Sequence, residues 1–291
     1  MADPVAGDTV GSYKIESQLG EGGMGRVYKA TGGDGRPVAL KIVKDEMVGD
    51  EIFLKRFKRE ADVARRIDHP NVVPVLDTGD HDGLPWAAQL FVSGGSLEER
   101  LDKWGTLDLH QVIAIFTQVA AGLDAIHENG LIHRDLKPGN ILMDERGTPY
   151  IADFGLAKDH QSEGTVLTRP GQALGSMDYM APEQIRGEEV GPATDVYALA
   201  CMLFELLTGQ PPFADKVGMR IMWAHLQDPP PHASDVKPSL PRPVGDVILT
   251  GLLKEPSERP QTASEFMSRV EAAAGPPPEP DDMTVAPPPS S

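Results

Sequence analysis

Apolar and polar positions alternate in short runs over the first part of the chain, and this pattern predicts strands. The runs begin at Tyr13, and a Gly- and Asp-containing turn at 32–35 separates two of them. One amphipathic helix interrupts the strands, because Ile52, Phe53 and Phe57 recur at helical spacing within 50–67. The predicted strands lie at 13–20, 25–31, 36–43, 72–76 and 86–92.

The period changes after the sequence SGGS at 93–96, and the remainder of the chain is predicted to be mainly helical. Apolar residues recur at three- and four-residue steps in 109–130, and Gly130 ends this segment. The two parts together predict an α+β fold with two lobes, a strand-rich N-lobe with one main helix and a mainly helical C-lobe. Further helices are predicted at 195–208, 218–227, 243–253 and 263–273.

These patterns divide the chain into four segments. Residues 1–12 show no period and are predicted to be a disordered N-terminus. The N-lobe comprises residues 13–92 and the C-lobe residues 93–274. Residues 275–291 are rich in Pro and Ser and cannot bury enough apolar surface to fold, so we expect a disordered tail or a linker.

Composition argues against several classes of protein. The formal net charge of the 291 residues is −17, which argues against nucleic acid as a partner and against docking on anionic lipid. The start of the chain lacks the basic and apolar regions of a secretory signal, and no stretch reaches the roughly 18 apolar residues of a membrane span. The single cysteine, Cys201, cannot form an internal disulfide. We therefore expect a cytoplasmic location, either for this chain alone or for it as the cytoplasmic domain of a membrane-anchored protein.

One short segment concentrates polar residues between apolar ones. The sequence LIHRDLKPGNILM at 131–143 places His133, Arg134, Asp135, Lys137 and Asn140 within eight positions. The flanking apolar residues predict strands that enter and leave a buried place. Charged groups in such a place are costly unless they are paired or bind a ligand, so this segment is a candidate functional site.

A glycine-rich motif nearer the N-terminus is typical of nucleotide-binding turns. The sequence GEGGMGRV at 20–27 has Gly20, Gly22 and Gly25 at the spacing Gly-x-Gly-x-x-Gly. A strand, not a helix, follows it, which favours a hairpin flap over a dinucleotide-binding turn. Without Cβ atoms the backbone N–H groups of such a flap can approach phosphate oxygens. A purely structural hairpin is the alternative.

A lysine stands in the middle of the next predicted strand. Lys41 of VALKIV lies on the same face as Ala39 and Val43, because side chains alternate along a strand. A buried lysine requires a negative partner, and Glu60 on the following helix or a phosphate would serve. A surface lysine that reaches into solvent is the alternative.

Five motifs occur in the order that is typical of protein kinases. They are the glycine flap, VALK, HRDLKPGN at 133–140, DFG at 153–155 and APE at 181–183. On these motifs the chain resembles the eukaryotic-like (Hanks-type) bacterial serine/threonine protein kinases over roughly 13–273. Each motif alone is common by chance, but five in order, each in its expected structural context, are not.

The resemblance implies transfer of the ATP γ-phosphate to Ser or Thr hydroxyls of protein substrates, with Mg²⁺ or Mn²⁺ as the metal. It implies that Asp135 accepts the hydroxyl proton, that Lys137 steadies the γ-phosphate, and that Lys41, oriented by Glu60, holds the α- and β-phosphates. It assigns metal ligation to Asn140 and Asp153, whose oxygens suit a hard cation. The residues implied in ATP binding are Leu19, Gly20, Glu21, Gly22, Gly23, Met24, Gly25, Arg26, Val27, Ala39, Lys41, Leu90, Val92 and Leu142.

The resemblance also implies regulation by phosphorylation. A long polar segment lies between DFG and APE, and loops of this length are usually functional. Phosphorylation of Thr168 would give Arg134 a negative partner and raise activity, with Thr165 and Ser162 as weaker candidates.

Further positions match residues that support the site in this family. Ser176 is implied to contact Asp135 and Lys137, which favours a Ser or Thr acceptor. Asp195 is implied to anchor the catalytic loop by accepting backbone hydrogen bonds, and Glu183 to pair with Arg259. Two solvated charges are the alternative for that last pair.

Two positions depart from the family pattern. Gln89 stands where relatives often carry a large apolar residue, and we expect a more polar back pocket there. Ser96 stands where an acidic residue often meets the ribose, so that contact is expected to be weaker.

Two other functions stay open. The first is a pseudokinase scaffold that binds nucleotide without turnover, and the presence of Lys41, Asp135 and Asp153 argues against it. The second is a small-molecule kinase of related fold, and the APE segment argues against that. Relatives often pair through the N-lobe, and a homodimer of that kind is neither required nor excluded by any residue here.

Overall fold

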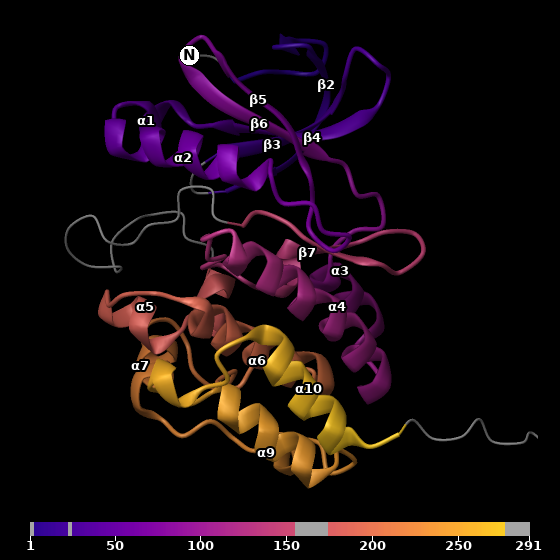
Figure 1. Ribbon diagram of the computed structural model, residues 1–291, viewed down its shortest axis with the longest axis vertical. Coiled ribbons are helices and arrows are strands. Elements are labelled where there is room, and N and C mark those ends of the chain that lie inside the picture. Colours follow the sequence, from indigo (N-terminus) through magenta and orange to yellow (C-terminus); the bar gives the residue numbers. More distant parts are fainter. Residues whose placement is uncertain (1–2, 23–24, 155–173, 277–291) are drawn as a thin grey trace, which may run out of the picture.

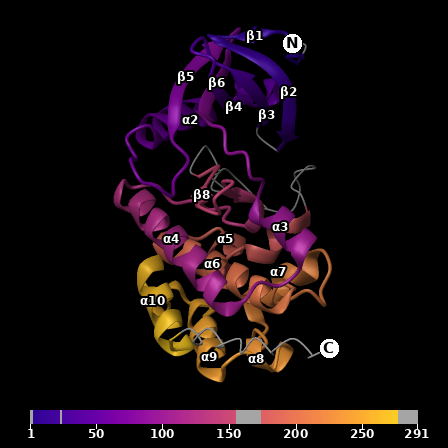
Figure 2. The same cartoon turned by 90° about the vertical axis from the view of Figure 1, so that its right-hand side faces the viewer.

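The computed structural model describes residues 3–22, 25–154 and 174–276. A six-stranded sheet forms the first part, and a group of helices forms the second part beneath it (Figure 1; Figure 2). This arrangement confirms the predicted α+β fold, with a strand-rich N-lobe and a helical C-lobe.

The N-lobe sheet has the order β1-β2-β3-β4-β6-β5, and all neighbouring strands are antiparallel. The first three predicted strands are found with their ends moved by a residue or less. The strands are β1 (Thr9–Val10), β2 (Tyr13–Glu21), β3 (Gly25–Thr31), β4 (Pro37–Val43), β5 (Val75–His81) and β6 (Leu84–Leu90).

The last two strands differ from the prediction, which placed them at 72–76 and 86–92. Val72 and Val73 leave the sheet and join the C-lobe instead, where the Val73 amide donates to the Ile151 carbonyl at 2.9 Å. Strand β5 is longer than predicted, β6 is shifted towards the N-terminus, and the two lie closer together because Asp82 and Gly83 connect them in a tight turn. Both residues have a positive φ, 54° and 85°, as two-residue hairpin turns require.

The segment before Tyr13 is not disordered throughout, contrary to the expectation for residues 1–12. Strand β1 adds to the edge of the sheet, with Thr9 opposite Lys14 and Val10 opposite Tyr13. Val10 is fully buried in the N-lobe core. A single apolar anchor thus recruits a segment that has no visible period in the sequence.

Helix α2 (Glu51–Ala64) lies along one side of the sheet and follows the short helix α1 (Asp45–Val48) (Figure 1). It begins after Asp50, whose carboxylate accepts the amides of Ile52 and Phe53 at 3.0 Å each. One face of α2 packs on the sheet, and the opposite face is exposed. The buried contacts join Phe53, Phe57 and Ala61 to Val43 and Ala87.

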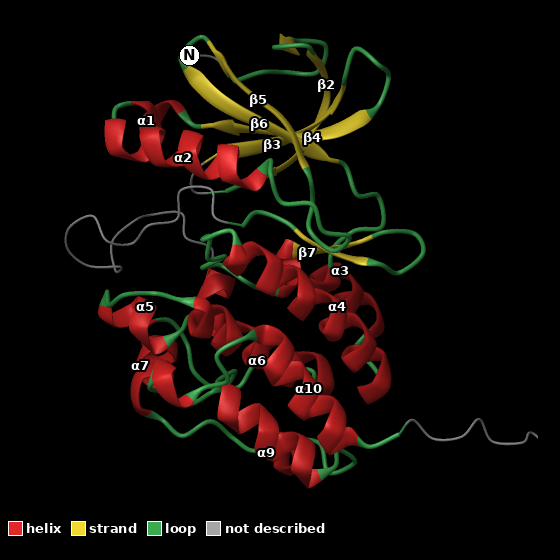
Figure 3. Cartoon of the chain, viewed as in Figure 1, coloured by secondary structure: helices red, strands yellow, loops and turns green. Residues whose placement is uncertain are grey.

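The C-lobe consists of helices and one small two-stranded sheet (Figure 3). The helices are α3 (Leu97–Trp104), α4 (Leu109–Glu128), α5 (Pro182–Arg186), α6 (Pro192–Thr208), α7 (Met219–Gln227), α8 (Ala233–Val236), α9 (Arg242–Gly251) and α10 (Ala263–Ala274). The sheet pairs β7 (Ile141–Met143) with β8 (Pro149–Ile151), and short 3₁₀ turns lie at η1 (Pro138–Asn140), η2 (Leu174–Tyr179) and η3 (Pro256–Glu258).

All five long helices predicted from the apolar period are present, with ends that differ by up to three residues. Helices α3, α5 and α8 were not predicted, because eight residues or fewer contain too few turns to show a period. The strand expected at Leu131 and Ile132 is absent from the described residues, and these two residues lie in a loop. The strand on the other side of the polar cluster, β7, is formed.

Helix α4 is, among the described residues, the one helix long and apolar enough to cross a membrane by length and composition. Eight of its residues are buried in the C-lobe core, which accounts for its apolar character. Helix α6 beside it is buried along almost its whole length. These two helices form the support on which the polar segment 131–140 rests.

The contact between Gly79 and Trp86 across β5 and β6 gives a test of N-lobe packing. A Cβ on Gly79 would lie 2.3 Å from the Trp86 ring, which is buried and packs edge-on against Tyr13. We expect Gly79→Ala to lower the free energy of unfolding by about 1–3 kcal/mol through overpacking. Gly33→Ala meets open space and should change it by less than about 0.5 kcal/mol. Urea unfolding of both variants measures the difference, and equal stabilities would show that the Trp86 ring yields freely.

Candidate functional site

The segment 131–140 is held by a buried histidine. His133 is fully buried, and its Nε2 lies 3.0 Å from the Ala152 carbonyl. Because a carbonyl only accepts, Nε2 carries the proton and Nδ1 is free to accept the Asp135 amide at 3.3 Å. The histidine thus ties the segment to the residue that precedes Asp153.

Asp195, in the first turn of α6, fixes the backbone of the same segment. Its carboxylate accepts the amides of His133 at 2.8 Å and Arg134 at 2.9 Å, and it lies 2.8 Å from His127 Nε2. Burial raises the pKa of Asp195, but the hydrogen bonds and charges of His127 and His133 together outweigh burial and hold that pKa below its ordinary value. This is the backbone contact that the sequence analysis expected of Asp195.

The backbone at Arg134 is strained. Its φ is +65°, in the region that non-glycine residues seldom adopt, and such a conformation costs about 1–3 kcal/mol. The Asp195 carboxylate holds its amide, and Gln184 Nε2 donates to its carbonyl at 2.8 Å. The two peptide groups that flank the Arg134 Cα are therefore fixed by side chains from other parts of the C-lobe.

Two of the predicted catalytic residues and one predicted metal ligand converge directly after Arg134. Asn140 Nδ2 donates to the backbone carbonyl of Asp135 at 2.7 Å and to its Oδ2 at 3.1 Å. Lys137 Nζ lies 3.5 Å from the same Oδ2. The Asp135 carboxylate is thus oriented by an amide and a cation, and it remains partly exposed.

Lys41 reaches this group from the N-lobe. It stands on β4 opposite Val27, it is 9% exposed, and its Nζ lies 2.8 Å from Asp153 Oδ1. Asp153 also has a positive φ, 58°. Two residues 112 positions apart therefore meet where the lobes join.

The partner of Lys41 differs from the prediction. Among the described residues, the carboxylate that pairs with Lys41 is Asp153 rather than Glu60. Glu60 lies near the end of α2 and has an interaction of its own. The sequence contains no signal that shows which of these two carboxylates pairs with Lys41.

The glycine flap is formed by the end of β2 and the start of β3. The Gly22 amide donates to the Gly25 carbonyl at 2.9 Å and closes the turn. Glu21 lies 2.6 Å from Lys44 Nζ and 3.4 Å from Arg26 Nε, so ion pairs hold the flap to the strand beside it. Leu19 and Gly20 precede this turn on β2. Gly23 and Met24 lie outside the described residues.

The residues predicted to enclose the adenine come from three strands. Val27 on β3 and Ala39 on β4 are half-buried, as is Leu142 on β7. The Leu90 amide donates to the Pro74 carbonyl at 3.1 Å, so this N–H group is already used. Val92 follows the end of β6 and is half-buried.

Two departures from the family pattern have structural counterparts. Gln89 is 5% exposed on β6, opposite Ala39, which places a polar side chain inside the N-lobe. Ser96 caps α3, since its Oγ accepts the Glu99 amide at 3.2 Å and Glu99 returns a bond to the Ser96 amide. Its hydroxyl therefore has a helix-capping role that the sequence analysis did not foresee.

The predicted phosphorylation sites lie outside what the structure describes. Ser162, Thr165 and Thr168 all fall within the segment 155–173. Ser176 lies in η2, and its side chain is not described. The described part of the site therefore ends at Phe154, which is 1% exposed.

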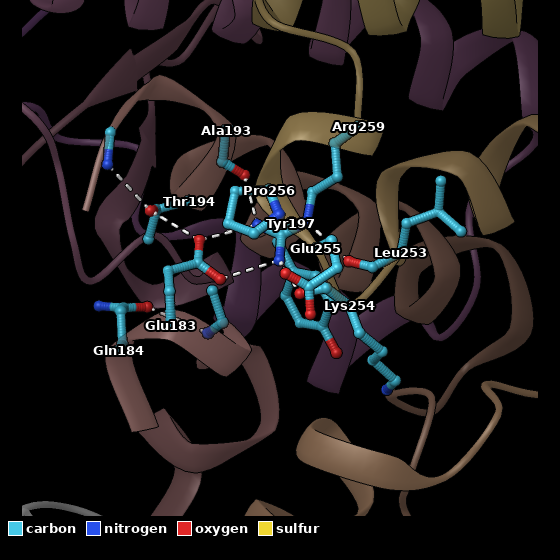
Figure 4. Close-up of polar contacts among 12 residues, drawn as sticks. Glu183, Gln184, Ala193, Thr194, Tyr197, Leu253, Lys254, Glu255, Pro256 and Arg259 are labelled. Carbon is cyan, nitrogen blue, oxygen red and sulfur yellow. Dashed lines mark hydrogen bonds and ion pairs between the residues drawn. The ribbon is translucent and has the colours of Figure 1, made fainter. Parts of the chain in front are cut away.

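Glu183 and Arg259 form a buried ion pair (Figure 4). The guanidinium makes two bonds of 2.8 Å to the carboxylate, and both side chains are at most 1% exposed. Arg259 also donates to the Ala193 carbonyl, and Thr194 Oγ1 donates to Glu183, so the pair is satisfied on all sides. The predicted pairing is formed, and it ties α5 to the start of α6 and to the end of the C-lobe.

A second carboxylate on α6 was not identified as a site residue. Glu205 accepts a hydrogen bond of 2.5 Å from the Tyr179 hydroxyl of η2. Burial raises the pKa of Glu205 to about 7, and nearby carboxylates, Asp178 foremost, add to the rise. The available signal was a glutamate inside the apolar run VYALACMLFELL, which only argued against a membrane span.

The residues at the lobe junction fit a hard cation. Asn140 and Asp153 offer an amide oxygen and a carboxylate, and Mg²⁺ is usually held by one or two such groups together with substrate phosphates. Among the described residues no group of three or more His, Cys, Asp or Glu forms a metal cage. The donor set therefore suits a metal that arrives with a phosphate ligand.

Comparison with known sequences identifies relatives over most of the chain. Residues 13–270 match the family model described as protein kinase domain. The chain is 41% identical over 267 residues to serine/threonine-protein kinase PknD of Mycobacterium tuberculosis, covering 91% of this chain and 40% of PknD. It is 37% identical over 266 residues to serine/threonine-protein kinase PrkC of Bacillus subtilis, covering 90% of this chain and 40% of PrkC. The chain thus spans about two fifths of the length of these relatives.

A solved structure is similar to the whole arrangement of lobes. The crystal structure of the Mycobacterium tuberculosis PknI kinase domain superposes with a TM-score of 0.76 at 31% identity, covering 94% of this chain and 100% of that one.

The ion pair between Glu183 and Arg259 gives a test of how much an unpaired buried charge would cost the C-lobe. Arg259→Met leaves a buried carboxylate without its cation and should lower the free energy of unfolding by about 3–5 kcal/mol. Arg269→Met removes the exposed partner of Glu265 and should cost about 0–1 kcal/mol. Thermal or urea unfolding compares the two, and similar losses would show that burial of the pair does not matter.

Proposed function

The chain belongs to the protein kinase domain family, and we propose that it transfers the γ-phosphate of ATP to Ser and Thr hydroxyls of proteins. The observation that carries this proposal is the meeting of Lys41, Asp153, Asn140 and Asp135 at the junction of the lobes. Phosphoryl transfer depends mainly on positioning and on neutralising charge, and this group contains a cation, carboxylates and an amide.

Asp135 is the residue that we assign to the acceptor hydroxyl. Its carboxylate is partly exposed and oriented by Asn140, which suits a group that accepts a proton from the hydroxyl or aligns it. Lys137 lies beside it and would stabilise the charge on the transferred group. The pairing of this lysine with the aspartate supports Ser and Thr acceptors, as do the names of the relatives.

Lys41 and Asp153 are the residues that we assign to the triphosphate and its metal. A bound Mg²⁺ or Mn²⁺ would neutralise phosphate charge and align the γ-phosphate. Asp153 and Asn140 would hold this ion through their oxygens. In the described conformation the Lys41 ammonium pairs with Asp153. We infer that the ammonium turns to the α- and β-phosphates when the nucleotide is present, with Glu60 as its partner.

The remaining ATP contacts are assigned to the flap and the half-buried apolar residues. The backbone from Gly20 to Gly25 would cover the phosphates, with Leu19, Glu21 and Arg26 at its ends. Val27, Ala39 and Leu142 offer apolar surface to the adenine faces, with Leu90 and Val92 at its edge. Because the Leu90 amide already donates to the Pro74 carbonyl, we assign the hydrogen bonds to the adenine edge to the Leu90 carbonyl and the Val92 amide.

A kinase assay tests these assignments. Lys41→Met, Asp153→Asn and Asp135→Asn should each lower the transfer rate from labelled ATP to a basic protein by at least about 100-fold. Asp135→Asn should still bind ATP, because this residue is assigned to the acceptor. Lys216→Met removes a half-buried lysine whose carboxylate partner among the described residues is its neighbour Asp215, and it should leave the rate unchanged.

The same assay separates the alternatives. Nucleotide binding without labelling of any substrate by the unaltered protein would favour a scaffold. Labelling of small hydroxyl compounds but never of protein would favour a small-molecule kinase.

We also propose that the chain phosphorylates itself on Thr168. A phosphate carries about −1.5 to −2 charges, and Arg134 next to Asp135 is the cation assigned to receive it. Mass spectrometry after incubation with ATP should find phosphate on Thr168, and Thr168→Ala should lower activity more than Thr165→Ala. A fully active protein with unmodified Thr168 would contradict the proposal.

We propose a cytoplasmic catalytic domain that acts on protein substrates, and an acidic enzyme favours basic ones.

A further inference from the structure

The outer face of helix α2 is unusually basic for this chain. Eight exposed positions recur along 51–66, and they follow the helical period that leaves Phe53 and Phe57 on the buried face. Five of the eight are cations and two are carboxylates, whereas the whole chain has a net charge of −17. The eight residues are Glu51, Ile52, Lys55, Lys58, Arg59, Asp62, Arg65 and Arg66. We call them the α2 outer face.

Four of these cations have no ion pair among the residues that the structure describes. They are Lys58, Arg59, Arg65 and Arg66, whereas Lys55 lies 3.5 Å from Glu51. Asp62 stands between the two pairs of cations but lies within ion-pair distance of none of them. The α2 outer face therefore retains a positive charge that the fold itself does not neutralise.

Cations elsewhere in the chain either are paired or stand singly. Among the described residues Lys14, Arg146 and Arg220 are exposed without an ion pair, but they lie far apart in the sequence. Four other cations at the surface, from both lobes, each lie within 3.3 Å of a carboxylate. They are Arg36 with Asp34, Lys216 with Asp215, Arg242 with Asp235, and Arg269 with Glu265. In a protein with an excess of acid, an unpaired group of cations is thus a local property of α2.

Helix stability does not account for this group. Cations near the end of a helix interact favourably with its dipole, but the effect is confined to the last turn. It would explain Arg65 and Arg66 and not Lys58 and Arg59. Like charges three and four residues apart, as in Lys55 with Lys58 and Arg59, weaken a helix. The arrangement therefore costs stability and is not a device for gaining it.

We propose that the α2 outer face docks an acidic polypeptide segment of a partner protein. The two cationic pairs lie seven residues apart, which is two helical turns and about 10 Å along the axis. An extended segment covers that distance in about three residues, so a run of about six Asp and Glu residues would reach both pairs. The charge complementarity selects an acidic partner, and the acidic remainder of the chain opposes a long polyanion such as nucleic acid.

A binding measurement without ATP tests the proposal independently of phosphoryl transfer. The probe is a fluorescein-labelled peptide with about six Asp and Glu residues, and its control carries Asn and Gln at the same positions. Fluorescence anisotropy should show saturable binding of the acidic peptide only. Binding should weaken when salt is raised from about 50 mM to about 500 mM, because exposed charges are screened.

Two variants with the same change in net charge locate the site. The first replaces the four unpaired cations of α2 by Gln, as Lys58→Gln, Arg59→Gln, Arg65→Gln and Arg66→Gln. The second replaces the four paired cations, as Arg36→Gln, Lys216→Gln, Arg242→Gln and Arg269→Gln. Glutamine preserves helix propensity, and circular dichroism checks that both variants are folded.

We expect the first variant to bind the acidic peptide at least about tenfold more weakly and the second to bind within about twofold of the unaltered protein. Equal losses in both variants would show non-specific attraction and overturn the proposal. Absence of saturable binding, or equal binding of the neutral peptide, would overturn it as well. A DNA duplex that displaces the peptide from the α2 outer face and binds it more tightly would overturn the assignment of the partner as a polypeptide.

Discussion

The carboxylate of Asp195 is the group on which the arrangement of the site depends. It is buried at the start of α6, where a negative charge also interacts favourably with the helix dipole. Burying it is costly, and three donors offset that cost, two of them backbone amides of the catalytic segment. The hydrogen bonds from these two amides to the carboxylate also offset the cost of the strained backbone at Arg134.

The first turn of α6 extends this control to other parts of the C-lobe. Three consecutive residues each hold a different segment. The Ala193 carbonyl accepts from Arg259, Thr194 donates to Glu183, and Asp195 accepts from the catalytic segment. The start of one buried helix therefore connects the segment before α10, helix α5 and the segment 131–140. A shift of α6 would disturb all three together.

The loop between α2 and β5 packs against β8 of the C-lobe, close to Asp153, the partner of Lys41. Asn71 donates to the Pro149 carbonyl at 2.9 Å, and its own carbonyl accepts the Ile151 amide at 2.8 Å. Val73 then donates to the Ile151 carbonyl. Asp153 follows Ile151 by two residues, so the loop that fixes β8 to the N-lobe also fixes the acid that the lysine meets.

The sequence predicts the members of the site better than their contacts. The resemblance carried by HRDLKPGN, DFG and APE selected Asp135, Asn140, Asp153 and Glu183. It could not say that Lys41 pairs with Asp153, because two carboxylates stood at plausible positions and only the folded backbone decides between them. Ser96 shows the same limit, since a hydroxyl that caps a helix and one that faces a ribose look alike in a sequence.

Local signals were stronger for long elements than for short ones. The apolar period located α4, α6 and α10, which bury a full face. Strand β8 has three residues and forms because β7 and Asn71 offer partners for its backbone, which no pattern within three residues can reveal.

Burial on α6 has opposite consequences for its two acidic residues, and the difference lies in the donors that surround them. Asp195 has three donors and remains charged, with a lowered pKa. Glu205, nearly three turns further along, has the Tyr179 hydroxyl as its donor and carboxylates nearby, and its pKa rises to about 7. The number of donors thus separates a permanent charge, which holds the catalytic segment, from a group that is largely protonated below neutral pH. The first is an anchor at every physiological pH, whereas the second can hold η2 as either an acid or a carboxylate because a hydroxyl can donate to both.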